Sequence, residues 1–167
     1  MKWLGVLLVV LAGCGLGLYY ARRLYRRVTL LEQAIRLVDA LDQRMAYSSR
    51  PLSALCRELA GSPAARSWTL LTDTQSGLDK GEVFAAALTA AAERQQTVLT
   101  PEDRQLLAEF AAGCGRSGLR QQQAHFAAYR ERLERCCREA REQVQRRGPV
   151  YQMMGVAGGV CLALLLL

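Results

Sequence analysis

The chain is poor in the residues from which catalytic and metal sites are usually built. Its 167 residues include one histidine, His125, and two lysines, Lys2 and Lys80. The signatures of a phosphate-binding P-loop, a zinc-protease helix and a serine-hydrolase elbow are all missing from the sequence. Catalysis needs a nucleophile, a base and an orienting group in one place. We therefore expect a protein that is not an enzyme and needs no cofactor or metal.

Strand patterns and cysteine frameworks are also missing. No stretch alternates strictly between apolar and polar residues, as a half-buried strand does. The six cysteines match neither a C-x-x-C metal pair nor a disulfide framework, and we expect reduced structural thiols. They are Cys14, Cys56, Cys114, Cys136, Cys137 and Cys161. The fold class predicted from these absences is all-α.

Charge is missing from the two ends of the chain. Residues 3–20 and 150–167 contain no charged side chain, and each run of 18 residues would be about 27 Å long as a helix. This length is at the short end of what spans a bilayer core. We predict transmembrane helices over residues 1–21 and 149–167, with a cytoplasmic helical bundle over residues 22–148.

Arginines flank both uncharged runs on the side that faces the middle of the chain. Positive charge beside an apolar segment is retained in the cytoplasm, so we expect both termini to lie outside the cell. The same arginines account for most of the net charge of +7, which then reflects orientation and attraction to anionic lipid and does not indicate nucleic-acid binding. The membrane-flanking residues are Arg22, Arg23, Arg26, Arg27, Arg146 and Arg147.

The stretch "LAGC", which ends at Cys14, leaves a second interpretation open. An apolar run followed by small residues and a cysteine is typical of a bacterial lipoprotein signal, cleaved before that cysteine. The chain would then be an exported lipoprotein, anchored through Cys14, with its helical domain on the periplasmic or extracellular side. The apolar run continues to Tyr20, however, and four arginines follow closely. We favour the permanent anchor.

The region between the uncharged runs is predicted to form six helices, of which the first and last continue into the two runs. Apolar residues recur from Leu31 to Met45 at spacings of three and four, the pattern of a helix with one buried stripe. The clearest helix start is "TPED". Here Thr100 can cap, Pro101 suits the first turn and Asp103 imitates a capping box.

Two further helix starts contain proline. We expect Ser48 or Ser49 to cap a short helix that has Pro51 in its first turn. In "GSP", Ser62 is expected to cap another helix, with Pro63 near the first helical position. Both expectations rest on the missing N–H of proline, which costs nothing at a helix start.

The segment "GCGRSG" and the single histidine each admit a functional and a structural interpretation. Glycines with an arginine can surround a phosphate, but a turn between two helices has the same composition and needs no ligand. His125 has no histidine partner and lies on a glutamine-rich helix face, where we expect it to be solvent-facing or half-buried. We favour the structural interpretation of both.

Four features of the chain together resemble the stage III sporulation protein AB family of endospore-forming bacteria. They are the N-terminal anchor that leads into a long helix, the turn "MAYSSRPLSAL", the segment "LTPEDRQLLAEFAAGCGRSGLRQQQAHF" and the glycine-rich terminal run "MMGVAGGVCLALLLL". The resemblance extends from end to end. Three details depart from it: Arg50 replaces a threonine, Cys114 stands where the family has leucine, and "KGEVFAAAL" lacks a tryptophan.

The resemblance implies a function that composition does not. The family belongs to the complex that links mother cell and forespore, and its soluble domain is similar to the cytoplasmic domains of the type II secretion F protein. It implies a non-enzymatic scaffold in the mother-cell membrane facing the forespore. A cytosolic secretion-type ATPase and other membrane components of the complex would be its partners; self-association is left open.

The docking residues are a hypothesis that follows from the same resemblance. We expect the ATPase to contact exposed faces near the first interhelical turn and near the start of the last helix. Turn packing and a solvated helix face explain these positions equally well. The residues are Tyr47, Arg50, Pro51, Leu52, Gln121, Gln122 and Gln123.

Overall fold

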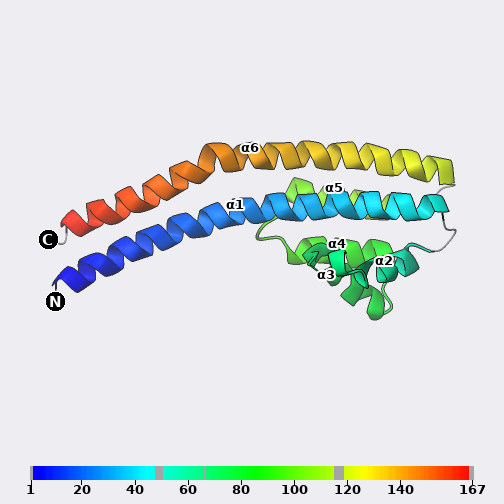
Figure 1. Ribbon diagram of the computed structural model, residues 1–167, viewed down its shortest axis with the longest axis horizontal. Helices are drawn as coiled ribbons and strands as arrows, with labels where there is room; N and C mark the ends of the chain where they lie inside the picture. Colours follow the sequence, from blue (N-terminus) through cyan, green and yellow to red (C-terminus); the bar gives the residue numbers. More distant parts are fainter. Residues whose placement is uncertain (1, 48–50, 66, 115–118, 166–167) are drawn as a thin grey trace. The chain divides into compact units, whose positions relative to one another are not determined.

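The computed structural model of the chain is all-α, as predicted (Figure 1). It describes residues 2–47, 51–65, 67–114 and 119–165. The side chains of residues 2–17 and 151–165 are described only in part. Within the described ranges there are six α-helices, one 3₁₀ turn and no strand. They are α1 (Lys2–Tyr47), α2 (Leu52–Ala60), η1 (Pro63–Ala65), α3 (Thr69–Asp79), α4 (Phe84–Arg94), α5 (Pro101–Gly113) and α6 (Leu119–Leu165).

The chain forms two compact units, each of which is described by itself. Thr29–Cys137 form the helical unit, which holds α2 to α5 with parts of α1 and α6. Met1–Val28 and Arg138–Leu167 form the terminal unit, which holds the remaining parts of α1 and α6. No break separates the two parts of either long helix, so the predicted continuity of the first and last helices is confirmed.

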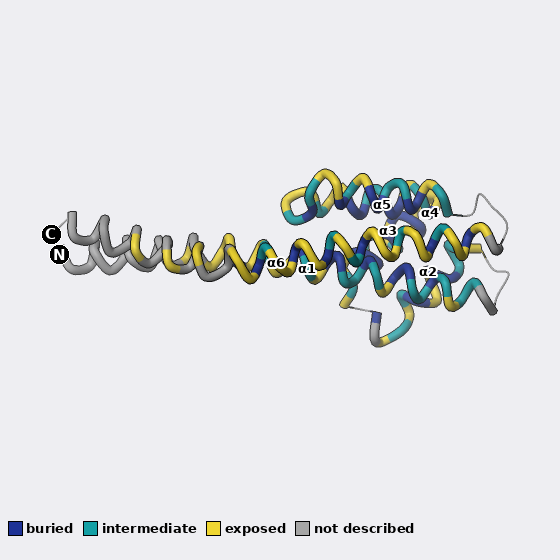
Figure 2. Tube along the Cα trace, turned by 90° about the horizontal axis from the view of Figure 1, so that it is seen from above, coloured by how far each residue is buried: buried dark blue, intermediate teal, exposed yellow. Residues whose placement is uncertain are grey.

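The core of the helical unit follows the apolar stripe predicted for the first helix. Leu31, Ala34, Val38 and Leu41 are at most 2% exposed, and Met45 at the end of the stripe is half-buried. Helix α6 buries its own series of residues at helical spacing, and Figure 2 shows buried residues of the helical unit in dark blue. That series consists of Gln122, Phe126, Leu133 and Cys137. The spacing of the apolar residues, and not the helix propensity of single residues, therefore determines which face of each long helix is buried.

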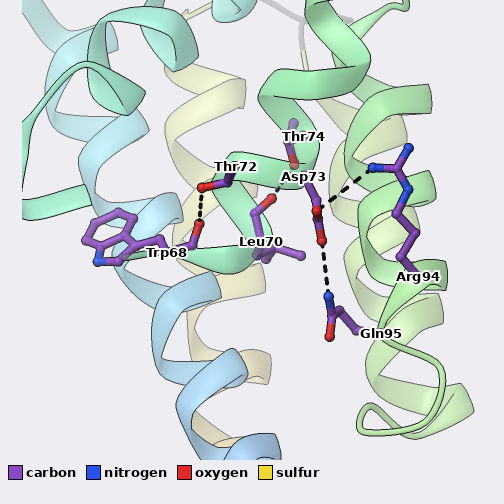
Figure 3. A network of polar contacts seen from close by, with 7 residues as sticks. All are labelled: Trp68, Leu70, Thr72, Asp73, Thr74, Arg94 and Gln95. Carbon is purple, nitrogen blue, oxygen red and sulfur yellow. Dashed lines mark hydrogen bonds and ion pairs between the residues drawn. The ribbon is translucent and has the colours of Figure 1, made fainter. Parts of the chain in front are cut away.

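Helix α3 packs closely on α4 because a glycine lies at their contact. A Cβ added to Gly77 would lie 2.8 Å from the Cβ of Ala87, closer than side chains approach. Polar contacts join the same two helices (Figure 3): the carboxylate of Asp73 accepts from Gln95 Nε2 at 3.1 Å and pairs with Arg94 at 3.9 Å. The contact is therefore fixed by a small residue where α3 ends and α4 begins, and by polar contacts at the other end of α4.

The predicted capping box at the start of α5 is confirmed. Thr100 Oγ1 accepts from the N–H of Asp103 at 3.2 Å, and Asp103 Oδ2 accepts from the N–H of Thr100 at 3.1 Å. Pro101 occupies the first helical turn. Two N–H groups that the helix cannot satisfy are thus paired by side chains.

The other two proline starts differ from expectation. Pro51 has extended backbone angles and is the N-cap residue of α2, so it lies before the first turn; Ser48 and Ser49 are outside the described residues. Pro63 begins the 3₁₀ turn η1, because the N–H of Ala65 bonds the carbonyl of Ser62, three residues back, at 3.1 Å. The next α-helix begins only at Thr69.

The described part of the terminal unit pairs α1 with α6. Arg27 donates from Nη1 to Oε1 of Gln143 at 3.1 Å, and Ala21, Ala140 and Val144 are buried. Among the described residues, no helix combines the length and the apolar character needed to cross a membrane. Most side chains of the two uncharged runs lie outside those residues, so the two transmembrane spans remain predictions.

Candidate functional site

The arginines expected to flank the membrane do not all face outward. Arg22, Arg23, Arg26 and Arg146 are exposed, whereas Arg27 is only 9% exposed and donates to Gln143. Arg27 therefore joins α1 to α6 within the terminal unit, although Arg23, one helical turn before it, is exposed. The side chain of Arg147 lies outside the described residues.

Large apolar and aromatic side chains are exposed mainly in the terminal unit. Of the seven exposed side chains of this kind among the described residues, six lie in that unit and only Val83 lies in the helical unit. Tyrosine and tryptophan with an apolar body and a polar tip favour the interface of a bilayer. The six are Leu18, Tyr19, Tyr20, Tyr25, Val150 and Met153. We call these six residues the apolar belt.

The residues expected to dock a partner have different exposures. Gln121 and Gln123 are exposed, but Gln122 is 5% exposed and belongs to the buried stripe of α6, so it cannot contribute to an exposed face. Successive helical residues point about 100° apart, and three consecutive glutamines therefore cannot share one face. Pro51 is exposed and Leu52 is half-buried. Arg50 and the side chain of Tyr47 lie outside the described residues.

His125 is half-buried, as expected, and it makes structural contacts. Its Nε2 is 3.2 Å from the carbonyl oxygen of Phe110, one of the carbonyls that end α5, and its ring stacks on Phe110 with centroids 5.7 Å apart. A Cβ added to Gly113 would lie 2.1 Å from His125 Cε1. The first glycine of "GCGRSG" thus makes room for the histidine that satisfies the helix end; residues 115–118 lie outside the described ones.

The described cysteines are structural. Cys56, Cys114, Cys136 and Cys137 form no disulfide. Burial raises the pKa of Cys56 to about 12, against a smaller opposing effect of Arg44. Burial likewise raises the pKa of Cys114 to about 12. Both thiols are protonated at neutral pH and are therefore poor nucleophiles.

A groove with acidic walls lies between α1 and α6 in the helical unit. Its volume is about 290 Å³, and its apolar lining includes Val38 and Phe126, which are 2% and 1% exposed. The charged lining comes from both helices, with two carboxylates spaced three residues apart on each. These charged residues are Asp39, Asp42, Arg130, Glu131 and Glu134. We call this feature the acidic groove.

The carboxylates of the acidic groove are only partly neutralised. Arg130 pairs with Asp39 at 3.1 Å and with Glu134 at 3.0 Å. Burial raises the pKa of the Asp39 carboxyl more than Arg130 lowers it, and the charges of Glu134 and Asp42 raise it further. Oδ1 of Asp42 is shielded from solvent and has no hydrogen-bond donor. Glu131 pairs with Arg135 at 3.7 Å, and the charge of Arg130 also acts on Asp42.

The acidic groove was not foreseen from the sequence. Its only signal there is a pair of acidic residues three apart beside the apolar stripe of each long helix. Such pairs are usually solvated helix surface. The register of α1 against α6, which brings Asp39 to Arg130, cannot be read from either helix alone.

Comparison with known proteins agrees with the resemblance found in the sequence. The family model described as stage III sporulation protein AB matches residues 2–167. No curated protein and no solved structure matches the chain. The match covers all of α1 through α6, including both long helices and the helices between them. The chain therefore belongs to the stage III sporulation protein AB family.

Proposed function

We propose that this protein is a non-enzymatic platform in the mother-cell membrane that faces the forespore. Its two terminal helices would anchor it, with both termini outside and the helical unit in the cytoplasm. There the helical unit docks a cytosolic secretion-type ATPase and lies beside the other membrane components of the sporulation complex. Membership of the family supports the link to sporulation.

The observation that carries the membrane part of the proposal is the apolar belt. Exposing Tyr19 at 65% and Met153 at 74% to water is unfavourable, whereas a bilayer interface accepts such side chains. Arg22 and Arg26 are exposed on the neighbouring turns, where they can reach phosphate groups of anionic lipid. Apolar, aromatic and cationic side chains thus follow one another as they do at a membrane surface.

Thiol labelling tests the topology. Cys114 is unsuitable as a reporter, because it is half-buried and its pKa is raised to about 12. We would introduce Ser76→Cys, at an exposed position of α3, into a chain that keeps Cys14 but lacks the other five cysteines, expressed in vegetative cells, and compare it with the same chain without the substitution. A membrane-impermeant maleimide should label position 76 only after lysis, and should label a cysteine appended after Leu167 without lysis. Labelling of position 76 in intact cells would instead support an exported chain anchored through Cys14.

Co-purification tests docking of the ATPase. The variant that changes Gln121 and Gln123 to arginine alters only exposed side chains of α6 and should weaken binding about tenfold. Gln96→Arg is the matched control, since Gln96 is exposed in the connection between α4 and α5. Equal binding by both variants would remove these two positions of α6 from the interface. No binding by the wild-type chain in detergent or in nanodiscs would contradict the platform proposal.

A further inference from the structure

The net charge of the chain is concentrated in the terminal unit. Of the 22 basic and 15 acidic residues, nine basic and two acidic ones belong to residues 1–28 and 138–167. The helical unit contains thirteen of each and is therefore neutral. The terminal unit thus carries the whole charge of +7, and no acidic residue precedes Glu32 in α1. Such an excess of one sign attracts a partner of the opposite sign.

The arginines of the two units also differ in their partners. In the helical unit, seven arginines form ion pairs with carboxylates, for example Arg57 with Asp79 at 3.6 Å. In the terminal unit, Arg22, Arg23 and Arg26 are exposed and form no ion pair or hydrogen bond with another described residue. Three cations therefore stand together on α1 without a compensating anion from the described part of the chain.

The spacing of these three arginines favours a shared anion. Residues three or four positions apart are neighbours on a helix surface, so Arg26 lies beside both Arg22 and Arg23. Like charges at this spacing destabilise a helix. A phosphate group removes that cost, because its oxygens accept hydrogen bonds from more than one guanidinium group.

The same face of α1 continues toward the N-terminus with an aromatic ring and a glycine. Gly15, Tyr19, Arg22 and Arg26 follow one another at spacings of three and four residues and therefore share one side of the helix. Tyr19 is 65% exposed, and its ring suits the depth of lipid headgroups. A Cβ added to the exposed Gly15 would meet no described atom within 4 Å, so the backbone there is open to a hydrocarbon chain.

Helix α6 differs from α1 because it supplies its own counter-charge. The exposed Arg138 and Arg146 each lie four positions from Glu142, and Arg146 pairs with that glutamate at 4.0 Å. The cations that need an external anion are therefore those of α1.

We infer that one anionic phospholipid binds to the face of α1 formed by Gly15, Tyr19, Arg22 and Arg26. Its phosphate would accept from the guanidinium groups of Arg22 and Arg26, and an acyl chain would lie over Gly15. A zwitterionic lipid would bring its ammonium group close to Arg23, which favours the anionic class. Such binding rests on the proposed membrane anchor and deepens that proposal, because it places one lipid molecule on α1.

Retention of lipid tests the inference. The full chain is extracted with mild detergent from nanodiscs that contain equal amounts of phosphatidylglycerol and phosphatidylethanolamine, and native mass spectrometry counts the lipids that remain bound. The wild-type chain should retain one phosphatidylglycerol molecule. Changing Arg22 and Arg26 to Gln should lower the retained fraction about tenfold, because two cationic contacts are lost.

The matched control removes the same charge from other places. Arg36 and Arg138 are exposed and pair with no described carboxylate, so changing both to Gln should alter retention by less than about twofold. Gly15→Phe fills the open side of the helix and should also lower retention. Equal retention by the two double variants, equal retention of both lipids by the wild type, or unchanged retention by Gly15→Phe would overturn the inference.

Inorganic phosphate distinguishes a lipid from a free anion. Added at constant ionic strength, it should leave the lipid bound; release would show that the arginines bind any phosphate group and would overturn the choice of a lipid. Thiol labelling separates this inference from the platform proposal. A chain that retains no lipid while position 76 stays protected in intact cells would overturn the lipid site and leave the platform proposal intact.

Discussion

The helical unit and the terminal unit treat their apolar side chains in opposite ways. In the helical unit the large apolar residues of α1, α3, α5 and α6 turn toward one another, and Val83 is the only exposed one among the described residues. In the terminal unit, six remain exposed beside arginines. The helical unit therefore buries its large apolar side chains internally, while the terminal unit leaves six of them exposed.

The largest expected effect comes from emptying the core of the helical unit. Phe110 is 1% exposed and its ring meets that of Phe126 edge-on at 5.1 Å. Phe110→Ala should lower the free energy of unfolding by about 3–5 kcal/mol, because it removes buried surface and leaves a cavity. Denaturant unfolding in detergent measures it. Tyr25→Ala, at a side chain 59% exposed, should stay within about 0.5 kcal/mol. Equal losses would erase the contrast between the units.

A smaller effect is expected where α5 ends against α6. Gly113→Ala places a Cβ 2.1 Å from the His125 ring and should destabilise the helical unit by about 1–3 kcal/mol. Adding His125→Ala should recover part of that loss, which a double-mutant cycle measures. Gly61→Ala is the control: its Cβ would have ordinary contacts at 3.5 Å, so little change is expected. Full additivity of the two substitutions would show that glycine and histidine do not interact.

The cap of α5 should contribute about as much as a typical N-cap. Thr100→Ala removes the oxygen that accepts from the N–H of Asp103 and should cost about 1 kcal/mol. Ser76→Ala, on the exposed face of α3, should change stability by only a few tenths of that. Thermal unfolding followed by circular dichroism compares the two variants. A cap variant as stable as the Ser76 variant would mean that water replaces the threonine.

The smallest effect is a pH dependence from the acidic groove. The pKa of Asp39 is raised above 3.8 in the folded chain, chiefly by burial, so the folded state holds this proton more tightly than the unfolded state. The contribution of this proton to the free energy of unfolding is present below pH 3.8 and is lost as pH rises through the pKa of Asp39 in the folded chain. The variant Asp39→Asn cannot bind the proton and lacks this contribution. Stability of the wild type relative to this variant should therefore fall as pH rises; a rise would show that pairing with Arg130 outweighs burial.

The sequence predicts helices and their caps well where these depend on the spacing of residues within a short stretch of the chain. The all-α class, the long first and last helices, the buried stripe from Leu31 and the capping box at Thr100 each depend on residues close together in the chain. The starts near Pro51 and Pro63 were misjudged, because proline fits a cap or a 3₁₀ turn as well as a first α-helical turn.

The candidate sites were predicted less well than the elements. Gln122 is buried and Arg27 pairs with Gln143, because each lies on the inward side of its helix. The acidic groove depends on the register of α1 against α6, which brings together residues about 90 positions apart, such as Asp39 and Arg130. Amino-acid composition does not predict that register. Family membership supplied what the residues alone could not, namely the link to sporulation.

Lipid contact at two matched positions tests the contrast between the units most directly. Tyr19 and Val83 are exposed to similar extents, 65% and 76%, one in each unit. After Trp3 and Trp68 are changed to phenylalanine, a single tryptophan at position 19 or 83 reports quenching by phospholipid brominated near the top of its acyl chains. The account predicts strong quenching at position 19 and none at position 83. Equal quenching at both positions, or none at position 19, would contradict it.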